Sequence, residues 1–191
     1  KDFVKSSNID LVIVGPEKPL VNGIVDFLEK KKINVFGPNQ KVAQLEGSKI
    51  FTKQICEKYK IPTAKFGIFK SKEESIKFLS SADMPIVIKA DGLAAGKGVY
   101  ICENFENSKN AVTEIFNGKF GSAKKILIEE FLDGDEMSYF IISDGFTFKR
   151  FSTAQDHKRV GEGDVGNNTG GMGAYSPSGI INSELEDKII N

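Results

Sequence analysis

The sequence has 191 residues, 40% of them hydrophobic, so it is long enough to bury one large core or two small ones. Its 26 lysines and arginines balance 26 aspartates and glutamates, which leaves no overall field to attract nucleic acid or a membrane surface. Two cysteines without metal-type spacing, and no apolar run long enough for a membrane span or signal peptide, favour a reduced, cytoplasmic setting. We therefore expect a soluble globular protein whose anion sites are local.

The first elements predict a β-α-β unit over residues 9–38. Residues 9–14 form a nearly continuous apolar run, which is typical of a strand buried on both faces of a parallel sheet. Residues 32–36 restart a strand, and both runs end at a Gly-Pro pair. The apolar side chains between them recur at helical spacing, namely Leu20, Ile24, Phe27 and Leu28. This order indicates one end of a doubly wound fold.

A helix is expected from Ser48, its N-cap, to the residue before Ile61-Pro62, because proline disfavours helical geometry in the preceding residue. We expect a domain boundary near Pro62. A strand over residues 64–69 then leads into a capping box, Ser71 to Glu74, which opens a helix with Ile76 and Leu79 facing inward.

The most informative stretch is residues 85–101, PIVIKADGLAAGKGVYI. A strand ends in Lys89, a loop of glycines and alanines follows, and a strand resumes at Val99. Small residues let several backbone N–H groups point at one anion, and Lys89 and Lys97 add charge. The spacing is wrong for a P-loop. A P-loop needs four residues between its first glycine and its Gly-Lys pair, then Ser or Thr, and then a helix. We interpret the stretch as a phosphate-binding flap; the alternative is a plain glycine-rich hairpin.

A helix carrying Ala111, Val112, Ile115 and Phe116 follows the flap, and then a strand over residues 125–130. This strand completes a compact α+β module and opens an acidic strip, residues 126–136, with Glu129, Glu130 and Glu136. Backbone groups at a strand end can pair with adenine, and a carboxylate can accept ribose hydroxyls. An acidic exit from an edge strand is the alternative.

Residues 136–143 and 146–152 predict two strands joined by Asp144-Gly145, a dipeptide suited to a two-residue turn. Residues 152–179 then read as one long loop that includes Asp156, Lys158 and Arg159, and loops of this length are usually functional. The two basic side chains could clasp a phosphate or carboxylate, or could be solvated surface charges. His157 is the single histidine of the sequence, and we expect it to have a structural role rather than a catalytic one.

The chain resembles the glycinamide ribonucleotide synthetases (phosphoribosylamine–glycine ligases) of the ATP-grasp superfamily. Five segments carry the resemblance: VGPEKPLVNGIVD (14–26), LEGSKIFTK (45–53), IVIKADGLAAGKGV (86–99), IEEFLDGDE (128–136) and QDHKRVGEGDVGNNTGGMGAYSP (155–177). Asn167 departs from the proline expected there. The resemblance implies part of a doubly wound domain at 1–45, the start of an ATP-grasp domain at 46–63, its lid subdomain at 64–132 and part of its central subdomain, with an antiparallel sheet, at 133–191.

The resemblance also implies that ATP drives the ligation of glycine to 5-phosphoribosylamine through glycyl phosphate, giving glycinamide ribonucleotide, ADP and phosphate in purine synthesis. It assigns ATP binding to Lys49, Lys89, Asp91, Gly92, Leu93, Ala94, Ala95, Gly96, Lys97, Gly98, Glu129, Glu130, Leu132 and Glu136. Catalytic contacts fall to Asp156, Lys158 and Arg159. Substrate contacts fall to Glu17, Pro19, Leu20, Asn168, Thr169, Gly170, Gly171, Met172 and Gly173.

The family's Mg²⁺ or Mn²⁺ ligands are expected beyond Asn191, so no metal ligand is predicted in this chain. The sequence starts at Lys1 and ends within a helical pattern, and we expect a piece of a longer polypeptide that either stands alone or is fused to other purine-pathway domains. Alone, this piece is expected to have little or no ligase activity. Two alternatives stay open: another ATP-grasp ligase or carboxylase, and a non-catalytic ATP-binding module.

Overall fold

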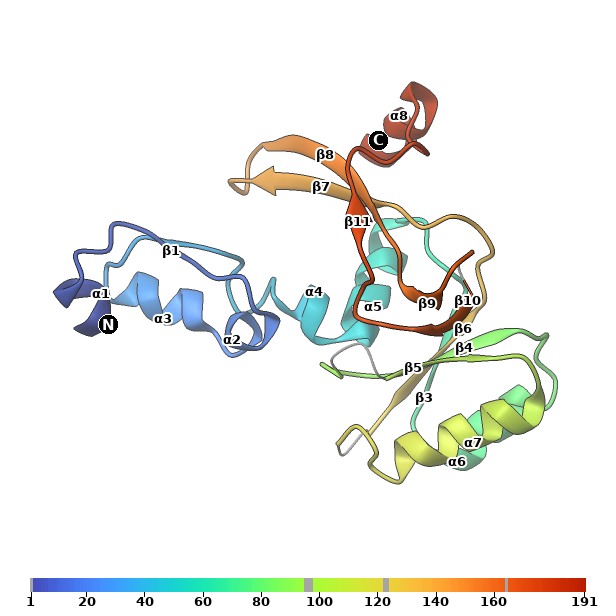
Figure 1. Ribbon diagram of the computed structural model, residues 1–191. Helices are drawn as coiled ribbons and strands as arrows, with labels where there is room; N and C mark the ends of the chain where they lie inside the picture. The colour runs from blue at the N-terminus through green and yellow to red at the C-terminus, as the bar shows by residue number, and fades with distance from the viewer. Residues whose placement is uncertain (1, 95–97, 122–123, 164) are drawn as a thin grey trace. The chain divides into compact units, whose positions relative to one another are not determined.

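The computed structural model describes residues 2–94, 98–121, 124–163 and 165–191. The chain forms two compact units, residues 1–132 and 133–191, and each has β-sheets of its own (Figure 1). The domain boundaries that the sequence suggests at residues 45, 63 and 132 stay predictions.

The N-terminal segment of the first unit contains the predicted β-α-β unit. Its elements are α1 (Asp2–Ser6), β1 (Val12–Ile13), α2 (Glu17–Val21), α3 (Ile24–Lys30) and β2 (Val35–Phe36). The two strands pair in parallel, with Val12 opposite Val35 and Ile13 opposite Phe36. The single expected helix is two helices, because Gly23 takes a left-handed conformation with φ +82° between them.

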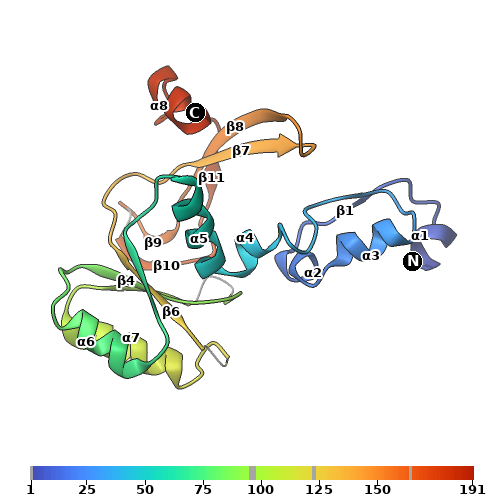
Figure 2. The same ribbon diagram turned by 180° about the vertical axis from the view of Figure 1, so that it is seen from behind.

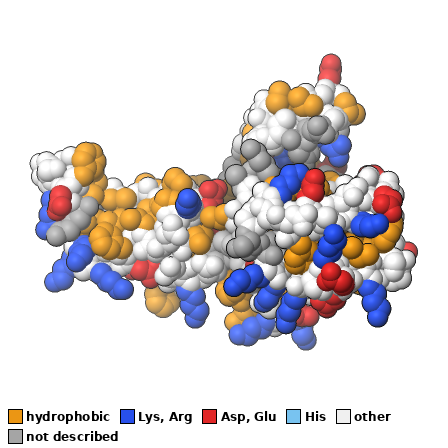
Figure 3. Space-filling model, turned by 90° about the horizontal axis from the view of Figure 1, so that it is seen from below, with side chains coloured by type: hydrophobic (Ala, Val, Ile, Leu, Met, Phe, Trp, Pro, Cys, Tyr) orange, Lys and Arg blue, Asp and Glu red, His pale blue; other side chains and the backbone are white. Residues whose placement is uncertain are grey.

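The expectation that the first strand is buried on both faces is wrong in the described chain. Ile13 is 69% exposed and Phe36 is 45% exposed. The reason is that β1 and β2 form a sheet of only two strands, while α3 buries Val25 and Leu28. Hydrophobic side chains consequently gather at the surface of this segment (Figure 3).

The next helices follow their local signals closely. After α4 (Gln44–Gly47), α5 runs over Lys49–Tyr59 and begins at Ser48, whose side chain accepts a hydrogen bond from the backbone N–H of Phe51. It ends at Lys60, which is left-handed and donates its N–H to the carbonyl of Cys56. The helix thus stops before Ile61-Pro62, as the sequence predicts.

A four-stranded antiparallel sheet forms the rest of the first unit. Its order is β3 (Phe66–Phe69), β6 (Ile126–Glu130), β4 (Ile86–Ala90) and β5 (Val99–Cys102). Helices α6 (Lys72–Leu79) and α7 (Phe105–Phe116) lie side by side on one face (Figures 1 and 2). The core of this layer comprises Phe69, Leu79, Ile86, Ile88, Ala90, Cys102, Ala111, Val112, Ile115, Ile126 and Ile128.

Side-chain caps begin both helices of this layer. Ser71 accepts from the N–H of Glu74, as the predicted capping box requires, but the carboxylate of Glu74 accepts from the N–H of Lys70 rather than of Ser71. Asn104 caps α7 by accepting from the N–H of Asn107. Leu79 is buried and Ile76 packs against the core, as the helical spacing indicates.

The second unit is built on a three-stranded antiparallel sheet in the order β11 (Ala174–Tyr175), β8 (Phe148–Asp156) and β7 (Ser138–Ser143). A second hairpin pairs β9 (Arg159–Gly161) with β10 (Val165–Asn168), and α8 covers Ser183–Ile190. The expectation of one long loop over residues 152–179 is therefore wrong, because the end of β8 and the strands β9, β10 and β11 lie within it.

The turn between β7 and β8 also differs from the prediction. Ser143 pairs with Phe148, so four residues turn the chain instead of two. The cause is the Asp144 carboxylate, which accepts from the N–H groups of Phe146 and Thr147 and folds the extra residues into the turn. The same bonds lower the pKa of the Asp144 carboxyl group.

Candidate functional site

The loop over residues 91–98, here called the lid loop, joins adjacent antiparallel strands as predicted. Ala90 donates its N–H to the carbonyl of Gly98 at 2.8 Å, which closes the base of the hairpin. Gly92 has φ +95°, and a β-carbon on Gly98 would lie 2.7 Å from that of Ala94, so both positions require glycine. Ala95, Gly96 and Lys97, which the sequence assigns to ATP, lie outside the described residues.

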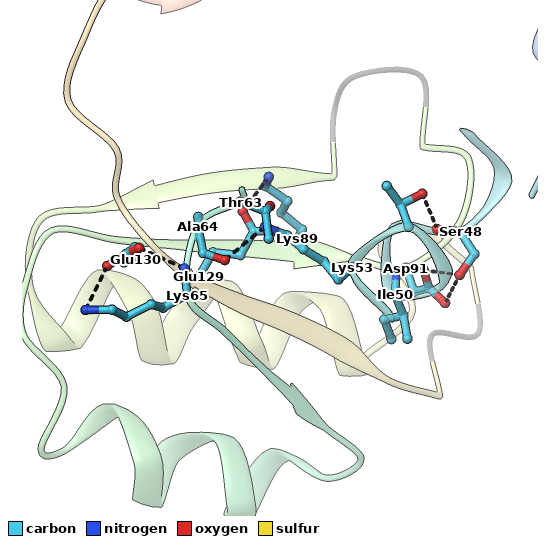
Figure 4. A network of polar contacts seen from close by, with 11 residues as sticks. Ser48, Ile50, Lys53, Thr63, Ala64, Lys65, Lys89, Asp91, Glu129 and Glu130 are labelled. Carbon is cyan, nitrogen blue, oxygen red and sulfur yellow. Dashed lines mark hydrogen bonds and ion pairs between the residues drawn. The ribbon is translucent and has the colours of Figure 1, made fainter. Parts of the chain in front are cut away.

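The base of the lid loop is held by the N-terminus of α5. The Asp91 carboxylate accepts hydrogen bonds from the hydroxyl of Ser48 at 2.9 Å and from the N–H of Ile50 at 3.2 Å (Figure 4). Lys49 donates from Nζ to the carbonyl of Gly92 at 2.8 Å. A carboxylate at a helix N-terminus is stabilised by the exposed N–H groups, so in this conformation Asp91 anchors the loop.

Beside this base lies a cavity of 460 Å³ within the first unit. It is lined by Glu17, Lys18, Glu46, Lys49, Gly92, Leu93, Ala94, Gly98 and Val99. The structure thus brings Glu17, predicted to contact substrate, next to five predicted ATP contacts, one of which is Lys49. Pro19 and Leu20 are not in the lining. Burial lowers the pKa of the Lys49 ammonium, and Lys89 lowers it further, against the opposing effect of Asp91.

Three charged side chains, here called the buried charge cluster, meet on the sheet face opposite α6 and α7. They are Lys53 of α5, Lys89 of β4 and Glu129 of β6 (Figure 4). Val87 lies opposite Glu129 and Lys89 lies opposite Leu127, so the two charged strand residues share one face. Lys89 Nζ lies 2.7 Å from Glu129 Oε2, and Lys53 Nζ lies 3.3 Å from Oε1.

Glu129 is only 5% exposed, and its Oε1 accepts no hydrogen bond from the described residues although Lys53 lies close to it. Lys53 instead donates to Thr63 Oγ1 at 2.6 Å and to the carbonyl of Ala64 at 3.2 Å. The carboxylate therefore has two cations beside it and a spare acceptor lone pair. Sequence reasoning missed Lys53; its signal is the i, i+4 spacing from Lys49, which sets both lysines on one side of α5.

The other two predicted nucleotide contacts in this unit behave differently. Glu130 accepts from the N–H of Lys65 at 2.8 Å and donates its own N–H to the Lys65 carbonyl, so it joins β6 to the entry of β3. Leu132 is largely exposed at the end of the unit.

In the second unit, Lys158 pairs with Glu136 and its Nζ lies 4.0 Å from Asp156 Oδ2. We call these three residues the exposed charge cluster, because Glu136 is 70% and Lys158 is 41% exposed at the side chain. Glu136, predicted to bind ribose, is thus paired with a residue predicted to be catalytic.

Residues 169–173 fold back against residues 157–158 through backbone bonds. Thr169 donates its N–H and its hydroxyl to the Lys158 carbonyl, and Met172 donates its N–H to the His157 carbonyl at 2.7 Å. His157 donates its own N–H to the Gly173 carbonyl, and its ring stacks on Tyr175 at 5.8 Å. The arrangement brings the predicted glycine-rich substrate segment to the basic run; the side chain of Asn168 lies outside the described residues.

A cavity of 370 Å³ opens at the same place, lined by His157, Arg159, Val160, Gly161, Glu162, Gly163 and Met172. Gly170 and Gly171 do not line it. Arg159 therefore lines this cavity, whereas Lys158 pairs with Glu136. The side chains of the run Asp156–Arg159 thus lie in two different environments.

Within the ranges that the structure describes, no group of three or more His, Cys, Asp or Glu side chains is arranged to hold a metal ion. In the same ranges, no helix is both long and apolar enough to cross a membrane.

Solved structures share this fold. A phosphoribosylamine–glycine ligase from Thermotoga maritima has a TM-score of 0.78 at 39% identity, covering 88% of this chain and 43% of that one. The biotin carboxylase domain of 2-oxoglutarate carboxylase from Hydrogenobacter thermophilus, solved with MgADP and bicarbonate, has a TM-score of 0.73 at 20% identity, covering 98% and 42%. The second likeness is one of fold alone. Together with the hairpin of β4 and β5, and with Lys49 and Lys89 near its base, the two likenesses define an ATP-grasp protein.

Family comparison narrows this class. Residues 1–46 match the phosphoribosylglycinamide synthetase N domain, and residues 47–191 match the phosphoribosylglycinamide synthetase ATP-grasp (A) domain. The chain belongs to the phosphoribosylglycinamide synthetase family. A phosphoribosylamine–glycine ligase from Mesorhizobium japonicum is 50% identical over 187 residues, which are 97% of this chain but 44% of that protein. The chain therefore spans less than half the length of this relative.

Proposed function

We propose that the protein containing this chain ligates glycine to 5-phosphoribosylamine at the expense of ATP, giving glycinamide ribonucleotide, ADP and phosphate through glycyl phosphate. The observation that carries the proposal is the family match over residues 1–46 and 47–191, in domain order. The geometry supports it: a glycine-rich loop stands over a cavity that receives Lys49, and Lys89 lies on the strand that enters the loop.

In this proposal the protein mainly aligns reactants and neutralises charge. Lys49 and Lys89 bind the ATP phosphates and residues 91–98 close over them. Glu129 and the backbone of Leu132 bind adenine, and Glu136 accepts hydrogen bonds from the ribose hydroxyls once Lys158 releases it. Glycine and phosphoribosylamine are bound by Asp156, Lys158, Arg159, residues 168–173, Glu17, Pro19 and Leu20.

Magnesium is the proposed companion of ATP, which agrees with the MgADP bound in the Hydrogenobacter structure. The described residues do not fit a metal site of their own, since they bring no three ligating side chains together. Manganese is an alternative companion ion.

The test is product formation by the full-length protein with ATP, Mg²⁺, glycine and 5-phosphoribosylamine formed in situ. We expect ADP release that requires both glycine and the amine and is not supported by bicarbonate. Lys89→Ala should lower kcat/KM by about 100-fold or more, because a charge-assisted phosphate contact is lost. The matched control is Lys109→Ala on α7, which removes an exposed lysine paired with Glu106 and should leave turnover unchanged.

ADP release that follows bicarbonate would instead indicate a carboxylase, and ATP binding without release would indicate a non-catalytic module. The isolated 191-residue chain should show little or no turnover; substantial turnover by it would contradict that part of the proposal.

A further inference from the structure

Lys53 has no assigned role, although it is a charged side chain held in a buried position. Its side chain is 10% exposed, and full burial of a lysine is rare unless the charge is paired. Its ammonium is fixed by Thr63 Oγ1 and the Ala64 carbonyl, both on the segment that leads from α5 to β3, and it lies 5.5 Å from the centre of the Phe66 ring. These contacts hold the cation in place independently of Glu129.

Lys89 is held less tightly. Its side chain is 27% exposed, and its ammonium pairs with Glu129 Oε2. Glu129 thus stands between a fixed cation on one oxygen and a more accessible cation on the other (Figure 4). Any anion that draws Lys89 away would leave Glu129 with Lys53 as its one ion-pair partner among the described residues.

We propose that Lys53 is a positioning residue: it keeps Glu129 compensated so that Lys89 can exchange from Glu129 to a nucleotide phosphate. This inference rests on the ATP-binding part of the proposed function. A buried carboxylate that loses its ion-pair partners is strongly destabilised, so without Lys53 the Glu129 carboxylate retains Lys89. The nucleotide then has to break that buried pair before it can use the lysine.

The first test measures the Kd for MgATP and the KM values of the full-length protein. Lys53→Met, which keeps the length of the side chain but removes the charge, should raise Kd and KM for ATP by about tenfold or more and change the KM for glycine less than about twofold. Lys53→Arg keeps the charge and should stay within about threefold of the parent protein. Lys109→Met on α7 is the control for loss of an exposed lysine.

The second test asks whether the effect passes through Glu129. In a Glu129→Gln background, where no buried negative charge retains Lys89, Lys53→Met should change the Kd for MgATP by less than about threefold. If the role of Lys53 were purely structural, its substitution would lower thermal stability, and its effect on the Kd for MgATP would not depend on Glu129. An unchanged Kd in Lys53→Met, or an equal loss in both backgrounds, would overturn the inference.

If Lys53→Met does not fold, the affinity of the Thr63→Val variant for MgATP tests the same inference. It removes the 2.6 Å contact to Lys53 Nζ at an exposed position and should weaken MgATP binding about two- to fourfold in the parent background and not in Glu129→Gln. Thr113→Val on α7, which removes a comparable 2.8 Å hydroxyl bond to the Lys109 carbonyl, is the matched control. Identical affinities for the two threonine variants would then count against Lys53.

The readouts separate the two proposals. MgATP binding that depends on Lys53 as stated, without formation of glycinamide ribonucleotide by the parent protein, would refute the ligase and leave the role of Lys53 standing. Normal ligase turnover with MgATP binding indifferent to Lys53 would refute only the role of Lys53.

Discussion

Both charge clusters contain a lysine paired with a glutamate, but the two pairs differ in their surroundings. In the buried charge cluster, Glu129 is 5% exposed and its lysine partners come from α5 and β4. In the exposed charge cluster, Glu136 is 70% exposed and its partner Lys158 lies two residues after the end of β8. Burial makes each lost partner costly in the first cluster, whereas water can replace a lost partner in the second.

The difference in burial indicates that the two clusters have different roles. The buried charge cluster joins segments that are distant in sequence and therefore helps to define the fold around the lid loop. The exposed charge cluster can exchange its pairing for a ligand at little cost. The effects of substitution should consequently follow burial, from a large loss at Glu129 to a small one at Glu136.

Glu129→Ala should have the largest effect on stability. It leaves the buried Lys53 and the partly exposed Lys89 without their anion, and the expected loss in the free energy of unfolding is about 3–5 kcal/mol. Urea denaturation, followed by far-ultraviolet circular dichroism, measures it. Glu106→Ala removes a carboxylate from the exposed Lys109 pair and serves as the control. If Glu129→Ala lost no more unfolding free energy than the control, burial would not make the loss of this carboxylate costly.

Asp91→Ala should have an intermediate effect, since the carboxylate is partly buried. It removes the acceptor for the Ser48 hydroxyl and for the N–H of Ile50, with an expected cost of about 1–2 kcal/mol in unfolding free energy. Asp91→Asn keeps one acceptor oxygen and should recover part of the loss. Full stability combined with lost nucleotide binding in Asp91→Ala would instead favour a direct contact between Asp91 and ATP.

The pH dependence of nucleotide affinity tests the half-buried Lys49. Burial lowers the pKa of its ammonium, and only the charged form attracts phosphate, so affinity should be full below that pKa and fall as the pH rises through it. The decline should begin at lower pH than for an ordinary lysine. Titration of MgADP between about pH 7 and pH 10 measures it, and Lys49→Arg, which stays charged, should flatten the profile. Superimposable profiles would contradict this assignment.

Glu136→Ala should have the smallest effect on stability, within about 0.5 kcal/mol, because exposed ion pairs contribute little and are screened by salt. The small difference in unfolding free energy from the parent protein should shrink further in about 0.5 M NaCl. A cost of several kcal/mol would show that exposure is a poor guide to the two clusters.

Local signals can be read from the sequence because they depend on neighbouring residues. The caps at Ser48 and Ser71, the end of α5 before Pro62 and the strand-loop-strand around Gly92 all have this origin. The contacts of Lys53 cannot be read in this way, since its carboxylate partner lies 76 positions away and meets it only when β6 joins the sheet.

The differences between prediction and structure have similar physical causes. The turn after Ser143 is longer than its dipeptide predicts because Asp144 uses its carboxylate to organise the extra residues. Residues 152–179 predict a loop because their strands are short and rich in glycine, but strand pairing with Ala174 and Tyr175 overrides that composition. The roles of individual site residues stay predictions, since ligand contacts depend on geometry beyond local pattern.

The strand order has a consequence for how the chain folds. β6 comes last of the four strands along the sequence, yet it lies between β3 and β4 and pairs with both. During synthesis, β3 therefore has no neighbour in this sheet until Glu130 has left the ribosome, and closing so long a loop slows the search for the native pairing. The carboxylate at Glu129 arrives on the same strand, so the nascent first unit completes its four-stranded sheet and gains the counterion of Lys53 and Lys89 at the same late stage.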